Sequence, residues 1–185
     1  MAKVFEAITP GLRDWIGRQK IFFVATAPLS TEGHINCSPK AGGDTFRILD
    51  DHTAAYLDLT GSGTETIAHV QENHRIAIMF CAFEGPPKIV RLHGLAEVVY
   101  PSQSEYAALS AQFPHNLGAR AVIKIRLTRI SDSCGYAVPL MDYRGDRKGL
   151  DDWATKQGDD GLADYRREKN QFSIDGLEGY RTPPS

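Results

Sequence analysis

The stretch KIVRLHGLAEVVY (residues 88–100) alternates along its length and decides the fold class of this chain. In an extended backbone, Val90 and Leu92 point to one face and Arg91 points to the other. The stretch AVIKIRLTRI (121–130) repeats the pattern, with apolar residues alternating with lysine, arginine and threonine. Long strands with one apolar face suit an antiparallel barrel that closes around its own side chains.

Four shorter apolar or alternating runs precede these strands, and glycine, proline, aspartate and serine separate them. They are IFFVATA (21–27), HINCSP (34–39), FRIL (46–49) and TAAYLDL (53–59). Because the runs follow each other closely, hairpin connections are favoured over βαβ crossovers, which need a dozen or more residues each. The residues alone therefore predict a mainly β (α+β) fold with an antiparallel barrel.

Helices flank the predicted strands. Thr9 followed by Pro10 predicts a helix start, because proline is tolerated at the first helical position. Ser102 and Glu105 have the spacing of a capping box, and they predict a second helix that ends at Pro114. After residue 140 the chain becomes strongly charged and predicts further helix outside the barrel.

Charge and composition exclude several classes of protein. The 185 residues carry a formal net charge of −2 at pH 7 and form no basic cluster, unlike nucleic-acid or anionic-membrane binders. Neither a signal peptide nor a membrane span is apparent, so we expect a cytoplasmic protein. The three cysteines lie far apart without CxxC spacing. They predict buried free thiols, with no metal site and no disulfide framework.

The turn TGSGTET (60–66) lies between a predicted strand and a predicted helix. Ser62 and Glu65 fit a capping box, so a plain helix start explains the turn. Alternatively, the glycines and the free N–H groups of the first helical turn form an anion site. The turn is neither a P-loop nor a GxGxxG turn, since it lacks the lysine of the first and the third glycine of the second. Lys40 is the candidate positive charge, although its position alone favours a solvated turn lysine.

The order of these parts resembles one known family. VATAPLSTEGHINCSPKAGG (24–43), FRILDDHTAAYLDLTGSGTETIAHVQENHRIAIMF (46–80) and RLHGLAEVV (91–99) resemble the flavin-binding split-barrel family related to pyridoxamine 5′-phosphate oxidase. The resemblance covers roughly residues 10–136. It implies an antiparallel Greek-key split β-barrel with flanking helices. It also implies a homodimer, with FMN held in a groove at the dimer interface.

The resemblance also implies site residues, carried over by position. The residues that would contact the FMN phosphate are Lys40, Ser62, Gly63 and Thr64. Those that would lie along the flavin are Ser38, Pro39, Asp58, Leu59 and Thr60, with Met79 and Arg91 further along the groove.

The chain departs from pyridoxamine 5′-phosphate oxidase in two places. Gly63 and Thr64 stand where that enzyme has a basic pair, and no counterpart of its C-terminal Arg-x-His segment is present. The stretch SCGYAVPL (133–140) looks instead like the strand end of an uncharacterised subgroup, in which Cys134 to Tyr136 reach the partner's flavin. The sequence alone favours an ordinary strand end with a glycine turn for this stretch.

We therefore expect an FMN-binding split-barrel domain (1–140) and a charged helical extension (141–185) packed on the barrel or on the dimer partner. The expected function is that of an oxidoreductase, transferring hydride or electrons through the flavin to a small-molecule substrate. No arrangement of side chains identifies a catalytic residue. The alternative is a non-catalytic module that binds or senses flavin or another ligand. Pyridoxamine 5′-phosphate oxidase itself and a haem-handling split barrel are lesser alternatives.

Overall fold

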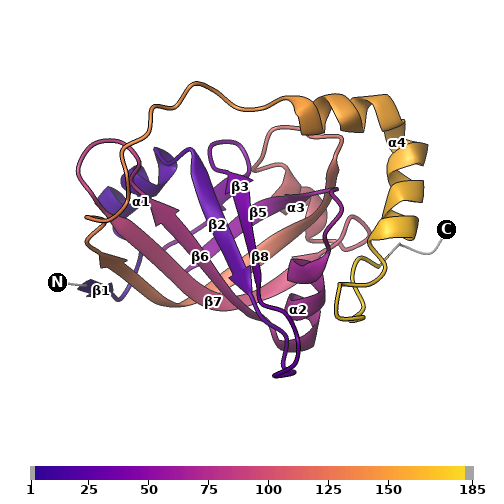
Figure 1. Cartoon of the computed structure of the whole chain (residues 1–185), viewed down its shortest axis with the longest axis horizontal. Coiled ribbons are helices and arrows are strands. Elements are labelled where there is room, and N and C mark those ends of the chain that lie inside the picture. Colours follow the sequence, from indigo (N-terminus) through magenta and orange to yellow (C-terminus); the bar gives the residue numbers. More distant parts are fainter. Residues whose placement is uncertain (1–2, 182–185) are drawn as a thin grey trace.

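The computed structural model describes residues 3–181 (Figure 1). Strands and helices follow one another in this part of the chain as β1 (Lys3–Phe5), α1 (Pro10–Gly17), β2 (Ile21–Thr26), β3 (Asn36–Ala41), β4 (Phe46–Ile48), β5 (Thr53–Leu59), α2 (Glu65–Asn73), β6 (Arg75–Cys81), β7 (Ile89–Val99), α3 (Tyr106–Ser110), β8 (Ala119–Ser133) and α4 (Gly149–Lys169).

The strands form one antiparallel sheet in the order β3-β2-β6-β7-β8-β5-β4, and β1 pairs with β8. Successive strands form hairpins at β2–β3, β4–β5 and β6–β7, whereas α2 carries the chain from β5 across to β6 beside β2. The sheet curls so far that Lys40 of β3 reaches Asp58 of β5, with 3.4 Å between Nζ and Oδ1. This confirms the predicted mainly β split barrel with flanking helices.

The barrel interior is filled by aromatic and branched side chains. Phe22, Phe46, Tyr56 and Phe80 pack with ring centroids 5.1 to 5.8 Å apart. The predicted alternation is confirmed, because Val90 and the other apolar residues of β7 and β8 on the same face are buried in this core. Truncating a buried phenylalanine here is expected to cost about 3 to 5 kcal/mol, as in other protein cores.

A second apolar cluster lies on the outer face of the sheet. Leu57, Val99 and Val122 pack there against Leu109 and Phe113, which the α3 region supplies. The helix predicted between Ser102 and Pro114 therefore exists and covers this patch, but it ends at Ser110, earlier than predicted. It also begins later than predicted, at Tyr106, and its first turn has no side-chain cap.

The capping predictions are correct at one of three helices. Thr9 caps α1, with its hydroxyl accepting from the Leu12 amide at 3.3 Å. The capping boxes at the other two starts are wrong. Helix α2 begins at Glu65, and its N-cap residue is Thr64 rather than Ser62, without a side-chain cap bond. The spacing is present in the sequence, but the chain enters the helix two residues later than the box requires.

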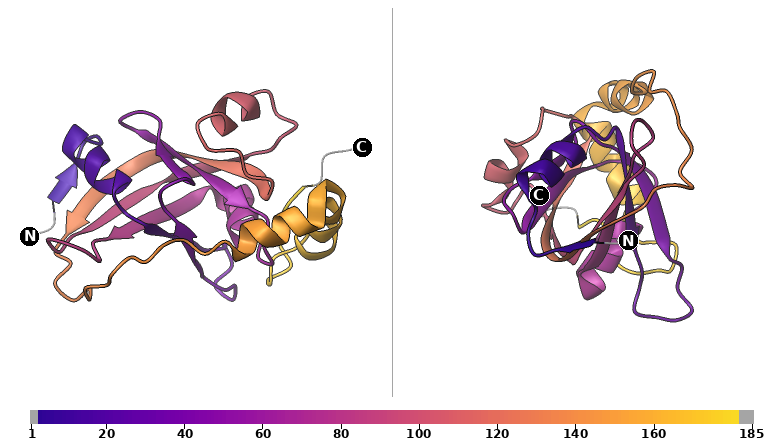
Figure 2. Two further views of the ribbon diagram at one scale, coloured as in Figure 1. Left: turned by 90° about the horizontal axis from the view of Figure 1, so that it is seen from above. Right: turned by 90° about the vertical axis from the view of Figure 1, so that its left-hand side faces the viewer.

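The chain after β8 leaves the barrel and returns to it. Residues 134–148 run across one side of the molecule to α4, which lies at the opposite end of the barrel from α1 (Figures 1 and 2). Helix α4 is kinked at Gly158, which has φ 65°, and is followed by residues 170–181, which we call the C-terminal tail.

No helix within residues 3–181 has the length and apolarity of a membrane span. The three cysteines are free, but only Cys81 is buried, so the prediction of buried thiols is wrong for Cys37 and Cys134.

Candidate functional site

The turn between β5 and α2 is held from inside by its carbonyl groups. The Gly61 carbonyl accepts from Nδ2 of Asn170 at 2.8 Å, and the Gly63 carbonyl accepts from Nη2 of Arg120 at 2.8 Å. Because these carbonyls face the protein, the turn presents its amide groups to the other side. Ser62 and Gly63 are exposed at the surface.

The amide groups of this turn have no protein acceptor. Within residues 3–181, no oxygen accepts a hydrogen bond from the backbone N–H groups of Ser62 to Thr66. Free N–H groups at the start of a helix bind anions, and the helix dipole adds to the attraction. One negative group is already near, because the Glu65 carboxylate folds back over Gly63. A Cβ on Gly63 would lie 2.6 Å from Oε2 of Glu65.

A buried charge cluster lies behind the turn. The Asp58 carboxylate is 1 % exposed; its Oδ2 accepts from Nε of Arg120 at 2.6 Å, and its Oδ1 lies 3.4 Å from Nζ of Lys40. Burial by itself raises the pKa of the Asp58 carboxyl, but the charges of Arg120 and Lys40 outweigh it and hold the pKa below its ordinary value. Two cations thus share one anion, and the cluster carries a net positive charge. The Lys40 side chain remains 26 % exposed.

The C-terminal tail packs directly on the turn. Asn170 is fully buried and also accepts from Nη1 of Arg120 at 2.8 Å through its side-chain oxygen. Gly179 lies against Thr64, where an added Cβ would meet the Thr64 hydroxyl at 2.6 Å. Thr64 is consequently 1 % exposed, and its hydroxyl has no partner among the described residues.

A polar network continues from the turn toward β2 and β3. Nδ2 of Asn36 donates to the hydroxyls of Thr26 and Thr66, and the Thr26 hydroxyl lies 3.0 Å from Nδ1 of His69. Burial lowers the pKa of His69, which favours its neutral form. Ser38 joins this network by donating to Oδ1 of Asn36 at 2.8 Å. These bonds fix the inner face of β3 against the first turns of α2.

The structure brings most of the predicted site residues together. Lys40, Asp58 and the turn at 61–64 lie around the cluster just described, and Ser38 lies next to it. Thr60 is buried beside the turn, and its amide and hydroxyl both donate to the Gly118 carbonyl. Pro39 is exposed, on the opposite face of β3 from Ser38 and Lys40.

Three predicted residues, Leu59, Met79 and Arg91, lie apart from this group. Leu59 packs with the outer apolar cluster. Arg91 is on β7, two strands from β5, where Nη1 donates to the Ser133 hydroxyl at 3.0 Å. Arg91 lies opposite Met79 of β6 in the sheet, and no bond within residues 3–181 joins it to Lys40, Asp58 or the turn, so its role in a shared groove depends on a second copy.

Three residues of the site, Arg120, Asn170 and Gly179, were not predicted from the sequence. Asp58 occupies an inward position of β5, and a buried carboxylate requires a cation. This position therefore indicates a buried lysine or arginine nearby. Arg120, at the start of β8, is that partner. Asn170 and Gly179 have no such signal, because their contacts join the turn to a tail more than a hundred residues later.

A comparison with known proteins identifies the family. The family described as pyridoxamine 5′-phosphate oxidase matches residues 8–134, and the chain belongs to it. The chain is also similar to "Pyridoxamine 5′-phosphate oxidase family protein ustO" of Aspergillus flavus. The two are 38 % identical over 193 residues, covering 95 % of this chain and 76 % of the relative.

Solved structures share the barrel. HupZ of Group A Streptococcus superposes with a TM-score of 0.51 at 26 % identity, covering 66 % of this chain and 91 % of HupZ. A protein of Clostridium acetobutylicum related to general stress protein 26 superposes with a TM-score of 0.50 at 11 % identity. The superposition covers 65 % of this chain and 84 % of the Clostridium chain, and this likeness concerns the fold alone. The family match and the fold confirm the resemblance inferred from the sequence.

Proposed function

We propose that this protein is an FMN-binding flavoprotein that works as a homodimer and acts as an oxidoreductase on a small molecule. Membership of the pyridoxamine 5′-phosphate oxidase family supports this proposal. The observation that carries it is the turn at 62–66, whose amide groups lack protein acceptors beside a net positive cluster. A phosphate is the group that best matches free helix-start amides and a nearby lysine.

The residues around the turn fit a phosphate, except for Thr64, which is covered. Ser62 and Gly63 are exposed, and Lys40 is partly exposed, so these three are accessible to a ligand. Thr64 lies beneath Gly179, so its hydroxyl contacts a phosphate only if the C-terminal tail moves. Ser38, Pro39, Asp58, Leu59, Thr60 and Arg91 remain proposed neighbours of the flavin.

Each group in the cluster has a separate task in this proposal. Arg120 neutralises Asp58 and holds the Gly63 carbonyl, so the turn keeps its amides directed outward. Lys40 supplies the charge that faces the ligand. The bound flavin would supply the redox chemistry, since the side chains here provide position and charge.

A second candidate function is flavin binding without turnover. The Asp58 carboxylate behind the turn is buried between two cations and is therefore unsuited to proton transfer. Oxidation of a reduced nicotinamide, measured with and without FMN, distinguishes the two functions. Turnover that depends on FMN supports the oxidoreductase, and tight FMN binding without turnover supports the binding module.

The proposal is tested by titrating the purified protein with FMN and with riboflavin. These ligands share the ring system and differ in the phosphate. We expect FMN to bind at least tenfold more tightly, which corresponds to about 1.4 kcal/mol. Equal affinities would exclude the turn as a phosphate site. Light scattering on the same samples should give the mass of two chains, and a single-chain mass with FMN bound would contradict the homodimer.

A further inference from the structure

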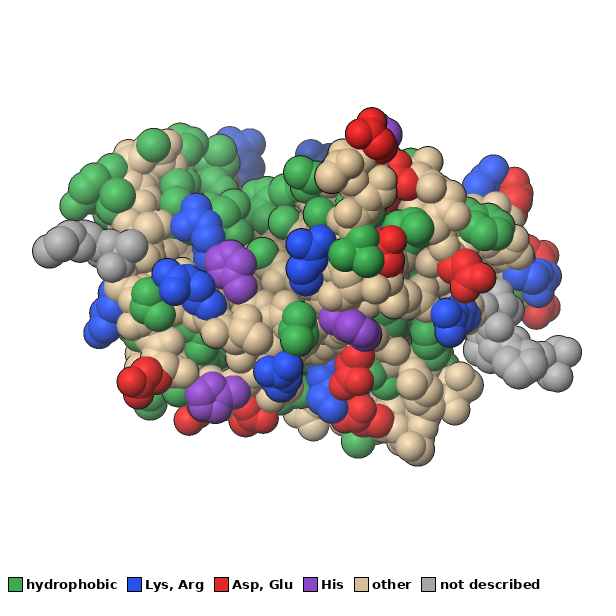
Figure 3. Space-filling model, turned by 90° about the horizontal axis from the view of Figure 1, so that it is seen from below, with side chains coloured by type: hydrophobic (Ala, Val, Ile, Leu, Met, Phe, Trp, Pro, Cys, Tyr) green, Lys and Arg blue, Asp and Glu red, His purple; other side chains and the backbone are tan. Residues whose placement is uncertain are grey.

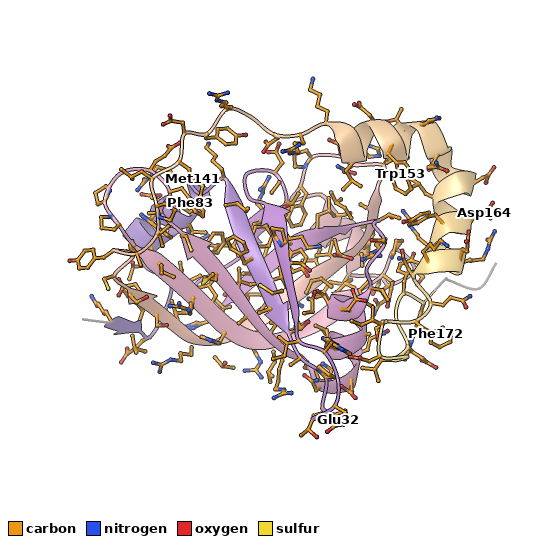
Figure 4. All side chains as sticks on the ribbon, in the orientation of Figure 1. Glu32, Phe83, Met141, Trp153, Asp164 and Phe172 are labelled. Atoms are coloured by element: carbon orange, nitrogen blue, oxygen red, sulfur yellow. The ribbon has the colours of Figure 1, made fainter. Side chains whose placement is uncertain are left out.

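A cleft of about 1070 Å³ lies at the α1 end of the barrel, away from the turn at 61–64. One wall comes from the end of α1, the start of β2 and the end of β3. The opposite walls are the loop 83–88 and residues 141–147, which we call the strap. The strap is fastened to the loop, because the Met141 amide donates to the Phe83 carbonyl at 2.9 Å and the Tyr143 amide donates to Oε1 of Glu84 at 3.2 Å. Figure 4 shows Phe83 and Met141 next to each other at this end.

The cleft is lined by aromatic and apolar side chains. Its main apolar residues are Trp15, Ile21, Pro39, Phe83, Met141 and Tyr143. Hydrophobic side chains gather at this end of the molecule, with basic side chains beside them (Figure 3). A cavity of this size with mostly apolar walls is typical of sites for organic molecules.

The charges in the cleft are distributed unevenly. The walls formed by α1, β2 and β3 contribute Arg18, Lys20 and Lys40, and no acid. The acids lie on the loop and the strap instead. Arg18 and Lys20 have no acidic partner within 4.0 Å in residues 3–181, whereas Lys40 is held by Asp58.

Two ammonium groups lie over aromatic rings in this cleft. Nζ of Lys20 is 5.2 Å from the centre of the Tyr143 ring, and Nζ of Lys88 is 5.4 Å from the centre of the Trp15 ring. Lys88 is also 3.6 Å from Asp132, so Lys20 is the freer cation. Each pair places a positive charge at the face of an aromatic ring, so a planar ligand that carries an anionic group meets a cation and an aromatic side chain together in this cleft.

We infer that this cleft binds the small-molecule substrate, and that this substrate is a planar aromatic acid. The inference rests on the proposed function in one respect. Pro39 and Lys40 line the cleft and are also proposed neighbours of the flavin, so a ligand in the cleft lies beside a flavin on β3. Lys20 pairs with the acid group of the ligand, and Trp15 and Tyr143 contact its ring.

The test uses two fluorescent probes that share their rings. 8-Anilinonaphthalene-1-sulfonate carries an anionic group, whereas N-phenyl-1-naphthylamine has none. We expect the anion to bind more tightly. Lys20→Met is expected to weaken the anion about threefold, the size of a partly exposed charge contact, and to leave the neutral probe unchanged. Lys156→Met, on the exposed face of α4, is the matched control and should change neither affinity.

A filling variant shows that both probes occupy the cleft. Ala41 is exposed and lines the cleft, so Ala41→Phe should exclude both probes while the barrel still folds. Equal effects of Lys20→Met on the two probes, or binding that survives Ala41→Phe, would overturn the inference.

A calorimetric titration of FMN-loaded protein separates this site from the flavin site. The sulfonate should still bind when FMN is present. Displacement of the sulfonate by FMN would assign the cleft to the flavin; the inference would then fail and the proposed function would stand. Charge-selective binding to a protein that takes up no FMN would support the cleft and contradict the proposed function.

Discussion

Replacing Arg120 by methionine is expected to destabilise the fold severely and in a pH-dependent way. Arg120 bonds Asp58 at 2.6 Å, Asn170 at 2.8 Å and the Gly63 carbonyl at 2.8 Å, and it is 3 % exposed. Removing one partner of a buried ion pair costs about 3 to 5 kcal/mol, because the other charge stays buried. For a chain of this length, that corresponds to a fall in Tm of roughly 10 °C.

The pH dependence follows from Asp58. In the wild type its pKa is lowered, so its contribution to stability is present above the ordinary carboxyl pKa of about 4 and disappears as the pH falls through the folded value. In the variant, only the more distant and partly exposed charge of Lys40 opposes the effect of burial, so the pKa of Asp58 rises. Protonation of the Asp58 carboxylate in the variant then removes the buried charge at mildly acidic pH. The difference in unfolding free energy between wild type and variant should therefore narrow between about pH 7 and about pH 5.

Urea denaturation at the two pH values measures this difference. Arg126→Met is the matched control, because Arg126 is exposed on the same strand, and it should change the unfolding free energy by less than about 0.5 kcal/mol. If Arg120→Met does not fold, the double variant Asp58→Asn with Arg120→Met should recover much of the loss, since it leaves no unpaired buried carboxylate. A difference that is the same at both pH values would refute the reasoning.

Four further predictions concern the turn and the ligands of the protein. Lys40→Met should weaken FMN about tenfold and leave riboflavin unchanged in calorimetry, since a hydrogen bond to a charged group contributes about 1.5 to 3 kcal/mol; equal losses for both ligands would argue against a phosphate contact. Glu65→Gln should tighten FMN about threefold by removing a like charge, and looser binding would contradict this. Thr64→Val should raise the unfolding free energy by about 1 kcal/mol, because it removes an unpartnered buried hydroxyl; if FMN affinity also falls, the hydroxyl contacts the phosphate as predicted. Pyridoxamine 5′-phosphate should be a poor substrate because no Arg-x-His segment is present, and oxidation at a rate competitive with other flavin reactions would overturn this.

The barrel was predictable because its signal is local. Strands β7 and β8 show their alternation within a single window of sequence, and burial follows it over most of their length, except where the outer apolar cluster also buries Val99 and Val122. The helix starts were less predictable. A capping box requires a spacing and also a backbone entry at the right residue, and at α2 the entry occurs at Thr64, so Ser62 stays outside the helix.

The sequence predicted the part of the site that the barrel strands and the turn form, but not the part that the C-terminal tail forms. Lys40 and the turn belong to the ordered series of strands, and the family resemblance locates them. Asn170 reaches Gly61 across 109 positions. No pattern of residues within the tail encodes that contact, since it depends on the path of the strap and on the kink at Gly158.

The contact of the C-terminal tail with the turn also sets a temporal order. During synthesis Gly61 leaves the ribosome long before Asn170, with 109 positions between them. The nascent barrel can pair its strands in the meantime, but the Gly61 carbonyl and Nη1 of Arg120 must bond to water until the tail arrives. A newly made chain therefore passes through a stage with a formed barrel and an unfinished turn, and a cofactor that needs the finished turn is acquired late.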